Sequence, residues 1–209
     1  MKETTTNPRD FMELLEVFSI GLANGILDKR EVIKWADNII TQDEKPDYFI
    51  IELSLCGHKS INDIVSLINE YVGQDKPKIS GRIFLGLLYG AYLTGQIKLD
   101  KVTRAIYWIV WEDRLTEEEK SLIYGIDEDY DCAIDGIYGS VEIVEKEVLR
   151  FLEIYKDFRI ENFEDWRKID QTIEPKILQL TELVRQENKI IITTQTEQTK
   201  KIWWKFWAK

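Results

Sequence analysis

Apolar side chains recur along most of this chain at intervals of three and four residues, and few helix-breaking residues interrupt them. Only four prolines and eleven glycines are spread over its 209 residues. This spacing places apolar residues on one face of a helix and does not fit the alternation expected of strands. Hydrophobic residues make up 44% of the chain, which is enough for a substantial core. The pattern predicts an all-α protein.

Capping residues mark where the expected helices begin. Ser60 with Asp63, and Thr116 with Glu119, have the spacing of N-terminal capping boxes. The segment 48–55 is short and β-branched enough for a buried strand, but we favour a helix because a proline precedes it at a suitable first helical position. The other helices are expected to begin at or next to these residues: Pro8, Asp28, Ser80, Asp100, Ser140, Phe163 and Ile173.

We expect these helices to form a single domain over residues 1–194, with roughly 8–10 helices stacked as antiparallel hairpins. Residues 190–194 could form a short strand at its end. Gly25 and Gly95 lie in similar helix–turn–helix segments that are offset by 70 residues. The similarity is confined to turn and core positions, so it supports stacked hairpins without establishing a duplication.

Charge and residue types exclude several function classes. Acidic residues outnumber basic ones by 38 to 28, and the formal net charge of −10 argues against general nucleic-acid binding and favours a basic partner. Two cysteines rule out a disulfide framework and a four-thiolate zinc site, and a single histidine rules out most catalytic triads. No signal-peptide core is present, and the longest apolar run, residues 83–93, is too short to span a bilayer. We therefore expect a cytoplasmic protein without cofactors.

The segment from Asp127 to Gly136 is the strongest local anomaly. It contains five carboxylates and no basic residue. Its first three aspartates alternate as in a calcium-binding loop, but Cys132 takes the place of the required glycine and Tyr138 that of the bidentate glutamate. The segment therefore does not fit an EF-hand.

Three interpretations of this acidic segment remain. It could be a solvated turn that leads into a helix, a carboxylate-only Mg²⁺ or Ca²⁺ site, or a docking patch for a basic protein. We develop the third, because nearby tyrosines would supply the rigid aromatic contacts typical of interface centres. The candidate partner-binding residues are Tyr124, Asp127, Glu128, Asp129, Tyr130, Asp131, Asp135 and Tyr138.

Other chemistry-bearing residues have structural interpretations. Cys56 and His58 are separated by one glycine, and side chains two residues apart rarely point at each other, so we expect a buried cysteine and a histidine near a helix C-terminus. We expect no catalytic residue or metal ligand. The remaining tryptophans are expected in the core or along grooves: Trp35, Trp108, Trp111 and Trp166.

The last ten residues combine four lysines with four large aromatic side chains. We expect residues 195–209 to form a linker and this basic aromatic tail, which could lie at a membrane surface or dock onto a protein. Docking onto the chain's own acidic body or onto a partner is favoured, because ten residues form a few helical turns at most. The docking residues would be Trp203, Trp204, Phe206 and Trp207.

Two stretches combine a helix, a tryptophan and an acidic turn. They are Gly25-Ile26-Leu27, Ile33, Trp35-Ala36-Asp37 and Ile40, followed by Pro46-Asp47 and Phe49-Ile50-Ile51-Glu52-Leu53-Ser54. This pattern resembles small acidic immunity proteins of bacterial toxin systems. The resemblance covers about thirty residues and matches no functional residue one to one. It implies an antidote that binds its toxin tightly and blocks the toxin's active or target-binding surface.

Taken with the acidic segment, these observations predict a non-enzymatic immunity protein that neutralises a basic toxin, for instance a nuclease, through an acidic and aromatic surface. Two alternatives stay open. One is a metal-dependent hydrolase that uses the carboxylates of residues 127–135. The other is a peripheral membrane or scaffold protein anchored by its tail.

Overall fold

The computed structural model describes residues 7–73, 78–112, 114–187 and 189, and within them every regular element is a helix, as the spacing of apolar residues predicts. The expected strand at 190–194 and the tail at 195–209 lie outside the described residues. The α-helices are α1 (Met12–Ala23), α2 (Lys29–Gln42), α3 (Tyr48–Ser54), α4 (Ile61–Val72), α5 (Lys78–Leu93), α6 (Leu99–Trp111), α7 (Glu117–Ile123), α8 (Ile126–Ile134), α9 (Val141–Leu152), α10 (Trp166–Asp170) and residues 173–187. Shorter 3-10 turns are η1 (Pro8–Phe11), η2 (Leu55–His58), η3 (Glu153–Tyr155) and η4 (Ile160–Asp165).

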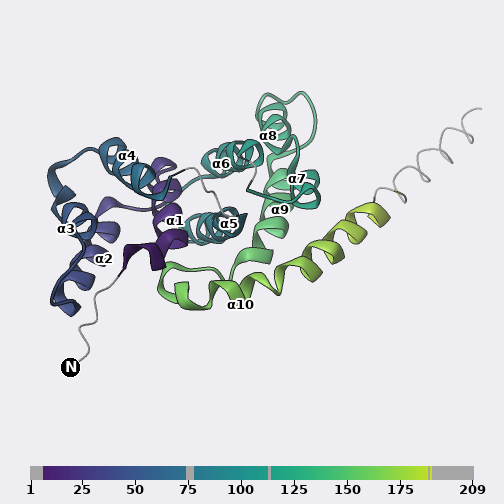
Figure 1. Ribbon diagram of the computed structural model, residues 1–209. Coiled ribbons are helices and arrows are strands. Elements are labelled where there is room, and N and C mark those ends of the chain that lie inside the picture. The colour runs from purple at the N-terminus through teal and green to yellow at the C-terminus, as the bar shows by residue number, and fades with distance from the viewer. Residues whose placement is uncertain (1–6, 74–77, 113, 188, 190–209) are drawn as a thin grey trace, which may run out of the picture.

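The helices form an elongated array in which α2, α3 and α4 lie at one end and α7, α8 and α9 at the other (Figure 1). The closest packing joins α1 with α4 and α5, α2 with α3, and α6 with α8. Several of these pairs are not consecutive in the chain, so the expected hairpins interlock rather than stack as separate units. The helix at 173–187 follows α10 and runs along the lower side of the array, away from α2 and α3 (Figure 1).

The centre of the array is built from α1 and α5, which are both apolar nearly all round. In α1 nine consecutive residues from Leu14 to Leu22 are buried. In α5 the buried residues include Ile83, Phe84 and Leu88, because a helix that is apolar on most of its faces is covered by its neighbours. Because no face of these helices is wholly polar, each must be covered by neighbours, and the other helices surround them.

Glycine allows close packing at one point of α5. A Cβ atom added at Gly86 would lie 2.8 Å from Cβ of Phe158 and closer still to the carbonyl oxygen of Tyr155. At Gly90 nothing lies within 4 Å. The four-residue spacing of these two glycines predicts close approach of a neighbouring backbone at both, and the structure shows it at Gly86 and not at Gly90.

Most of the expected helix starts are confirmed by their caps. Asp28, Ser60 and Thr116 each accept a hydrogen bond from a backbone N–H of the first turn and form capping boxes. At α3 the cap is Asp47, whose side chain accepts from N–H of Phe49 at 2.8 Å, so the preceding proline is not the first helical residue. Ser140 caps α9 as expected.

Three helix starts differ from the expectation, and one helix is shorter. In place of a helix from Phe163, residues Ile160–Asp165 form a 3-10 turn and α10 begins at Trp166. Ser80 does not cap α5, which already begins at Lys78; its buried hydroxyl accepts from Arg114 at 2.9 Å. Asp100 is the second residue of α6, because Lys98 is the cap. The apolar spacing after Ser140 predicts a helix as far as Phe158, but α9 ends at Leu152 and continues as a 3-10 turn.

The structure repeats the turn geometry expected at Gly25 and Gly95. Both glycines have positive φ, 68° and 73°, which a residue with a side chain adopts only with strain. After Gly25 the N–H of Ile26 donates to the oxygen of Gly21 at 2.8 Å, and after Gly95 the N–H of Gln96 donates to the oxygen of Ala91 at 2.9 Å. The pair α5 and α6 thus repeats the local architecture of α1 and α2.

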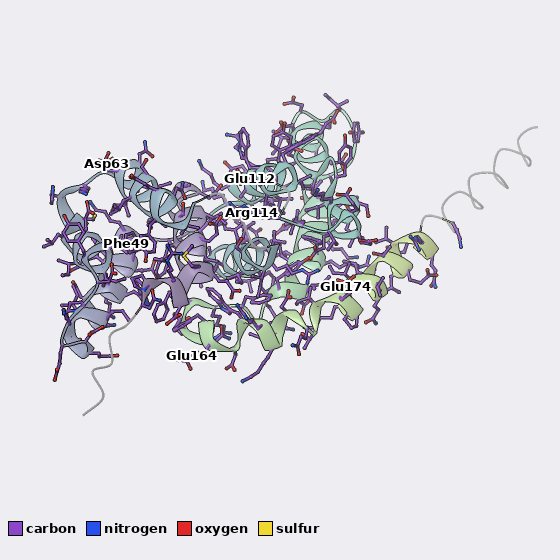
Figure 2. All side chains as sticks on the ribbon, viewed as in Figure 1. Phe49, Asp63, Glu112, Arg114, Glu164 and Glu174 are labelled. Atoms are coloured by element: carbon purple, nitrogen blue, oxygen red, sulfur yellow. The ribbon has the colours of Figure 1, made fainter. Side chains whose placement is uncertain are left out.

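Two buried arginines tie the helices together. Arg114 forms ion pairs with Glu16 of α1 and with Glu112. Figure 2 labels Arg114 and Glu112 near the centre of the array. Arg82 of α5 pairs with three carboxylates, of which Glu119 is fully buried at 2.7 Å and Glu174 lies at 3.1 Å in the helix 173–187. The pairing is complete enough that no buried side-chain polar atom among the described residues lacks a partner.

Candidate functional site

The acidic segment is a helix rather than a turn. Gly125, with a φ of 80°, reverses the chain after α7, and α8 begins directly behind it. Three acidic residues, Asp127, Glu128 and Asp129, occupy the first turn of α8, where the positive end of the helix dipole stabilises them. The sharp turn at the glycine sets α8 against α6 (Figure 1).

The carboxylates of α8 divide between two sides of the helix. Asp127, Glu128 and Asp131 line hollows that α8 forms with α6. Asp129 lies on another side and accepts a hydrogen bond from the hydroxyl of Tyr138 at 3.2 Å. Asp135 ends the helix and is exposed. The predicted site is therefore one group of three carboxylates with two more beside it.

These carboxylates carry net charge on the surface. Among the described residues, no lysine or arginine forms an ion pair with any of the five. Arg104 lines a hollow together with Asp127 and Asp131 but is not paired with them. A negative field over this part of the molecule follows, because few local cations offset it.

An aromatic row on α6 lies beside these charges. Tyr107 contacts the ring of Trp108 edge-on at a centroid distance of 5.6 Å and that of Trp111 at 6.2 Å. The side chains are exposed to 59% for Trp108 and 64% for Trp111. The expectation that these two tryptophans lie in the core is wrong, and only their groove-lining alternative holds.

Two hollows follow the boundary between α6 and α8. The first, the aromatic hollow, has a volume of about 140 Å³ and is lined by Tyr107, Val110, Trp111, Ile123, Tyr124, Gly125, Asp127 and Glu128. The second has a volume of about 230 Å³ and is lined by Asp100, Thr103, Arg104, Tyr107, Trp108, Asp127, Tyr130 and Asp131. Tyr107 and Asp127 belong to both and separate them. We call the rings and carboxylates of both hollows the acidic–aromatic surface.

The three predicted tyrosines take different places around this surface. Tyr124 is 73% exposed and lines the aromatic hollow, whereas Tyr130 is half-buried and lines the second hollow. Tyr138 lies after α8, where the neighbouring Cys132 thiol and the hydrogen bond to Asp129 raise its pKa. The structure thus brings Tyr124 and Tyr130 together with the carboxylates that face α6, and separates Tyr138 from them.

The pattern of α6 contains the signal that sequence reasoning missed. Val102, Ala105, Ile106 and Ile109 form the buried stripe of this helix. Residues 104, 107, 108 and 111 form a second stripe with the same helical spacing on the opposite face. Since only one stripe of a helix at the edge of the array can face the core, the aromatic one had to be exposed.

The pair Cys56 and His58 has the expected structural role. Cys56 is buried in η2, and its thiol donates to the carbonyl oxygen of Glu52 at 3.2 Å. Burial raises the pKa of this thiol. A reactive cysteine needs the opposite shift, so this position does not support nucleophilic chemistry.

Within residues 7–73, 78–112, 114–187 and 189, no group of three or more histidine, cysteine, aspartate or glutamate residues is placed to hold a metal ion. No helix in the same residues is long and apolar enough to cross a membrane. The residues predicted for tail docking, Trp203, Trp204, Phe206 and Trp207, lie outside the described part of the chain. No protein-family model matches this chain, and no curated protein or solved structure matches it either.

Proposed function

We propose that this protein is a non-enzymatic binding protein that captures a basic protein partner on its acidic–aromatic surface. One observation carries the proposal: Trp108 and Trp111 are exposed side by side with carboxylates that no cation of the described chain pairs. Interfaces are enriched in tryptophan and tyrosine at their centres, and complementary charge around them guides the partner.

The fold alone does not explain the exposed rings. A large aromatic side chain left in water forgoes about 1.5–3 kcal/mol that burial would contribute. The opposite face of α6 already buries the apolar stripe of this helix, so Trp111 and its neighbours add nothing comparable to the core. Contiguous exposed apolar surface of this kind is typical of interaction sites.

The later carboxylates of α8 support the same proposal. Asp131 and Asp135 lie in the last turn and at the C-terminal cap, where the helix dipole disfavours negative charge. They are also spaced four residues apart, as are Asp127 and Asp131, so neighbouring charges on the helix repel each other. A partner that supplies positive charge would offset this cost.

In this proposal the partner is a basic toxin and the protein is its immunity protein, as the resemblance of residues 25–54 implies. An enzyme that acts on nucleic acid presents cations to the phosphate backbone. A surface with carboxylates in place of phosphates and rings in place of bases can cover such a site. Binding alone then blocks the toxin, and no catalytic residue is needed.

Capture on the immobilised protein tests the proposal. Proteins from the source cell are compared on the wild type, on a site variant and on a charge-matched control. The site variant carries Asp127→Asn, Glu128→Gln, Asp131→Asn and Asp135→Asn. The control carries Glu44→Gln, Glu70→Gln, Glu161→Gln and Glu164→Gln, four exposed glutamates on other elements.

The proposal expects one basic protein that the wild type and the control retain and the site variant loses. Co-expression of the wild type should also protect cells from that protein, and the site variant should protect them less. Equal capture by all three forms, or capture of acidic proteins only, would contradict the proposal.

A further inference from the structure

The aromatic hollow has the form of a box with a charged rim. Rings of Tyr107, Trp111 and Tyr124 wall it, and the carboxylates of Asp127 and Glu128 line it as well. No basic residue of the described chain is among its lining residues. The second hollow differs in this respect, because Arg104 shares it with the carboxylates.

Its size fits one side chain. Pockets for whole small-molecule ligands usually enclose about 300–1,000 Å³. The aromatic hollow encloses about 140 Å³, less than half of the lower bound. A space of this size is suited to one side chain of a larger molecule rather than to a whole ligand.

The lining specifies the charge and the shape of that side chain. Aromatic faces attract cations through the negative potential of their rings, and carboxylates favour the same charge. A guanidinium is planar and weakly hydrated, so it can stack on a ring while its N–H groups bond a carboxylate in pairs. An ammonium is a compact, strongly hydrated charge and gains less from stacking.

We propose that the aromatic hollow binds an arginine side chain of the basic partner. This inference rests on the proposed function, since it assigns one contact of that same surface. The guanidinium lies among the rings of Tyr107, Trp111 and Tyr124, and its N–H groups donate to Asp127 or Glu128. Charge complementarity selects a partner's arginine, because the only charged groups among the described residues that line the hollow are the carboxylates of Asp127 and Glu128.

Peptide binding to the full chain tests this assignment. The probes are tetra-arginine and tetra-lysine peptides of equal charge. The protein carries 5-fluorotryptophan, and the fluorine signal of Trp111 is assigned with a Trp111→Phe variant. We expect tetra-arginine to shift this signal and to bind at least about threefold more tightly than tetra-lysine.

Variants of the walls separate the hollow from the general acidic charge. Trp111→Leu and Tyr124→Leu should each weaken the binding of tetra-arginine by about fivefold. The matched control is Tyr48→Leu on α3, which replaces an equally exposed tyrosine and should leave the affinity unchanged. Circular dichroism checks that each variant keeps its helix content.

Two results would overturn the assignment. If both peptides bind equally and the wall variants have no effect while Asp131→Asn weakens binding, the surface is acidic but the hollow holds no arginine; the proposed function then survives. If the Trp111 signal responds only after residues 200–209 are deleted, the occupant is the chain's own tail. Failure of partner capture in the charge variants, by contrast, contradicts the proposed function whatever the peptides do.

Discussion

The side chain of Gln96 donates from Nε2 to the carbonyl oxygen of Ile26 at 2.8 Å. These residues lie 70 positions apart and follow Gly95 and Gly25, the two glycines that end α5 and α1 with positive φ. The turn between α5 and α6 is therefore hydrogen-bonded to the turn between α1 and α2. Helix α6, which carries the aromatic side of the acidic–aromatic surface, begins directly after this turn and is thereby anchored to the N-terminal helices.

Removing this contact should loosen the junction between the two turns. Gln96→Ala is expected to lower the free energy of unfolding by about 1 kcal/mol, since a hydrogen bond to a buried carbonyl is lost. Gln42→Ala is the control, because Gln42 is also exposed and forms no side-chain hydrogen bond within the residues that the structure describes. Urea denaturation measures both. An equal loss in the two variants would show that the contact contributes nothing.

The two glycines of α5 should respond oppositely to alanine. Gly86→Ala places a methyl group against the backbone of Tyr155 and the side chain of Phe158, so we expect destabilisation of about 1–3 kcal/mol. Gly90→Ala meets open space and should stabilise the helix by about 0.5–1 kcal/mol. Thermal unfolding of the two variants checks the sign. Equal effects would contradict the close approach at Gly86.

The hydroxyl of Tyr92 donates to Glu145 Oε1 at 2.5 Å, and this bond, with burial, raises the pKa of Tyr92 to about 12. A tyrosine in an unfolded chain has a pKa of about 10. The folded state therefore holds the proton more tightly. Its contribution to stability is complete below pH 10 and is lost as pH rises from about 10 to about 12.

A Tyr92→Phe variant tests this pH dependence. At pH 8 the variant should be less stable than the wild type by about 1 kcal/mol, because the hydrogen bond is absent. Above pH 10 the difference should shrink, since only the wild type loses the contribution of Tyr92. Urea denaturation from pH 8 to pH 11 gives the comparison. A stability difference between the two proteins that grows with pH would contradict the raised pKa of Tyr92.

The charge of Asp131 should lower the stability of the protein and strengthen binding of the basic partner. Its charge lies in the last turn of α8 and repels Asp127 and Asp135, so Asp131→Asn is expected to stabilise the protein by about 0.3–1 kcal/mol. The same change should weaken binding of the basic partner. Thermal unfolding and partner titration are measured on one preparation. A variant that is less stable, or that binds the partner unchanged, would argue against a binding role for this carboxylate.

Much of the fold could be predicted from the sequence because its signals are local. Capping boxes at Ser60 and Thr116, and the glycines after α1 and α5, fix helix ends through hydrogen bonds within a few residues. The prediction that Ser80 caps a helix was wrong because a tertiary contact engages its side chain. Its hydroxyl accepts from Arg114, which lies 34 residues away, and no local pattern indicates this partner.

The candidate site was predictable in part. The charges of residues 127–135 stand out by composition, but their helical form places Asp129 away from Asp127 and Asp131, which a loop would not do. The rings of α6 were missed because a tryptophan is usually buried. Trp108 and Trp111 can be recognised as surface residues only once it is known that α6 buries its other face.

The association rate of the captured partner tests the central claim most directly. It is measured by stopped-flow mixing across a range of salt concentrations for the wild type, the site variant and the charge-matched control. We predict that the site variant associates about tenfold more slowly at low salt, with a much weaker salt dependence, and that the control resembles the wild type. Equal rates and equal salt dependence for the site variant and the control would contradict the claim that the carboxylates of α8 attract the basic partner electrostatically.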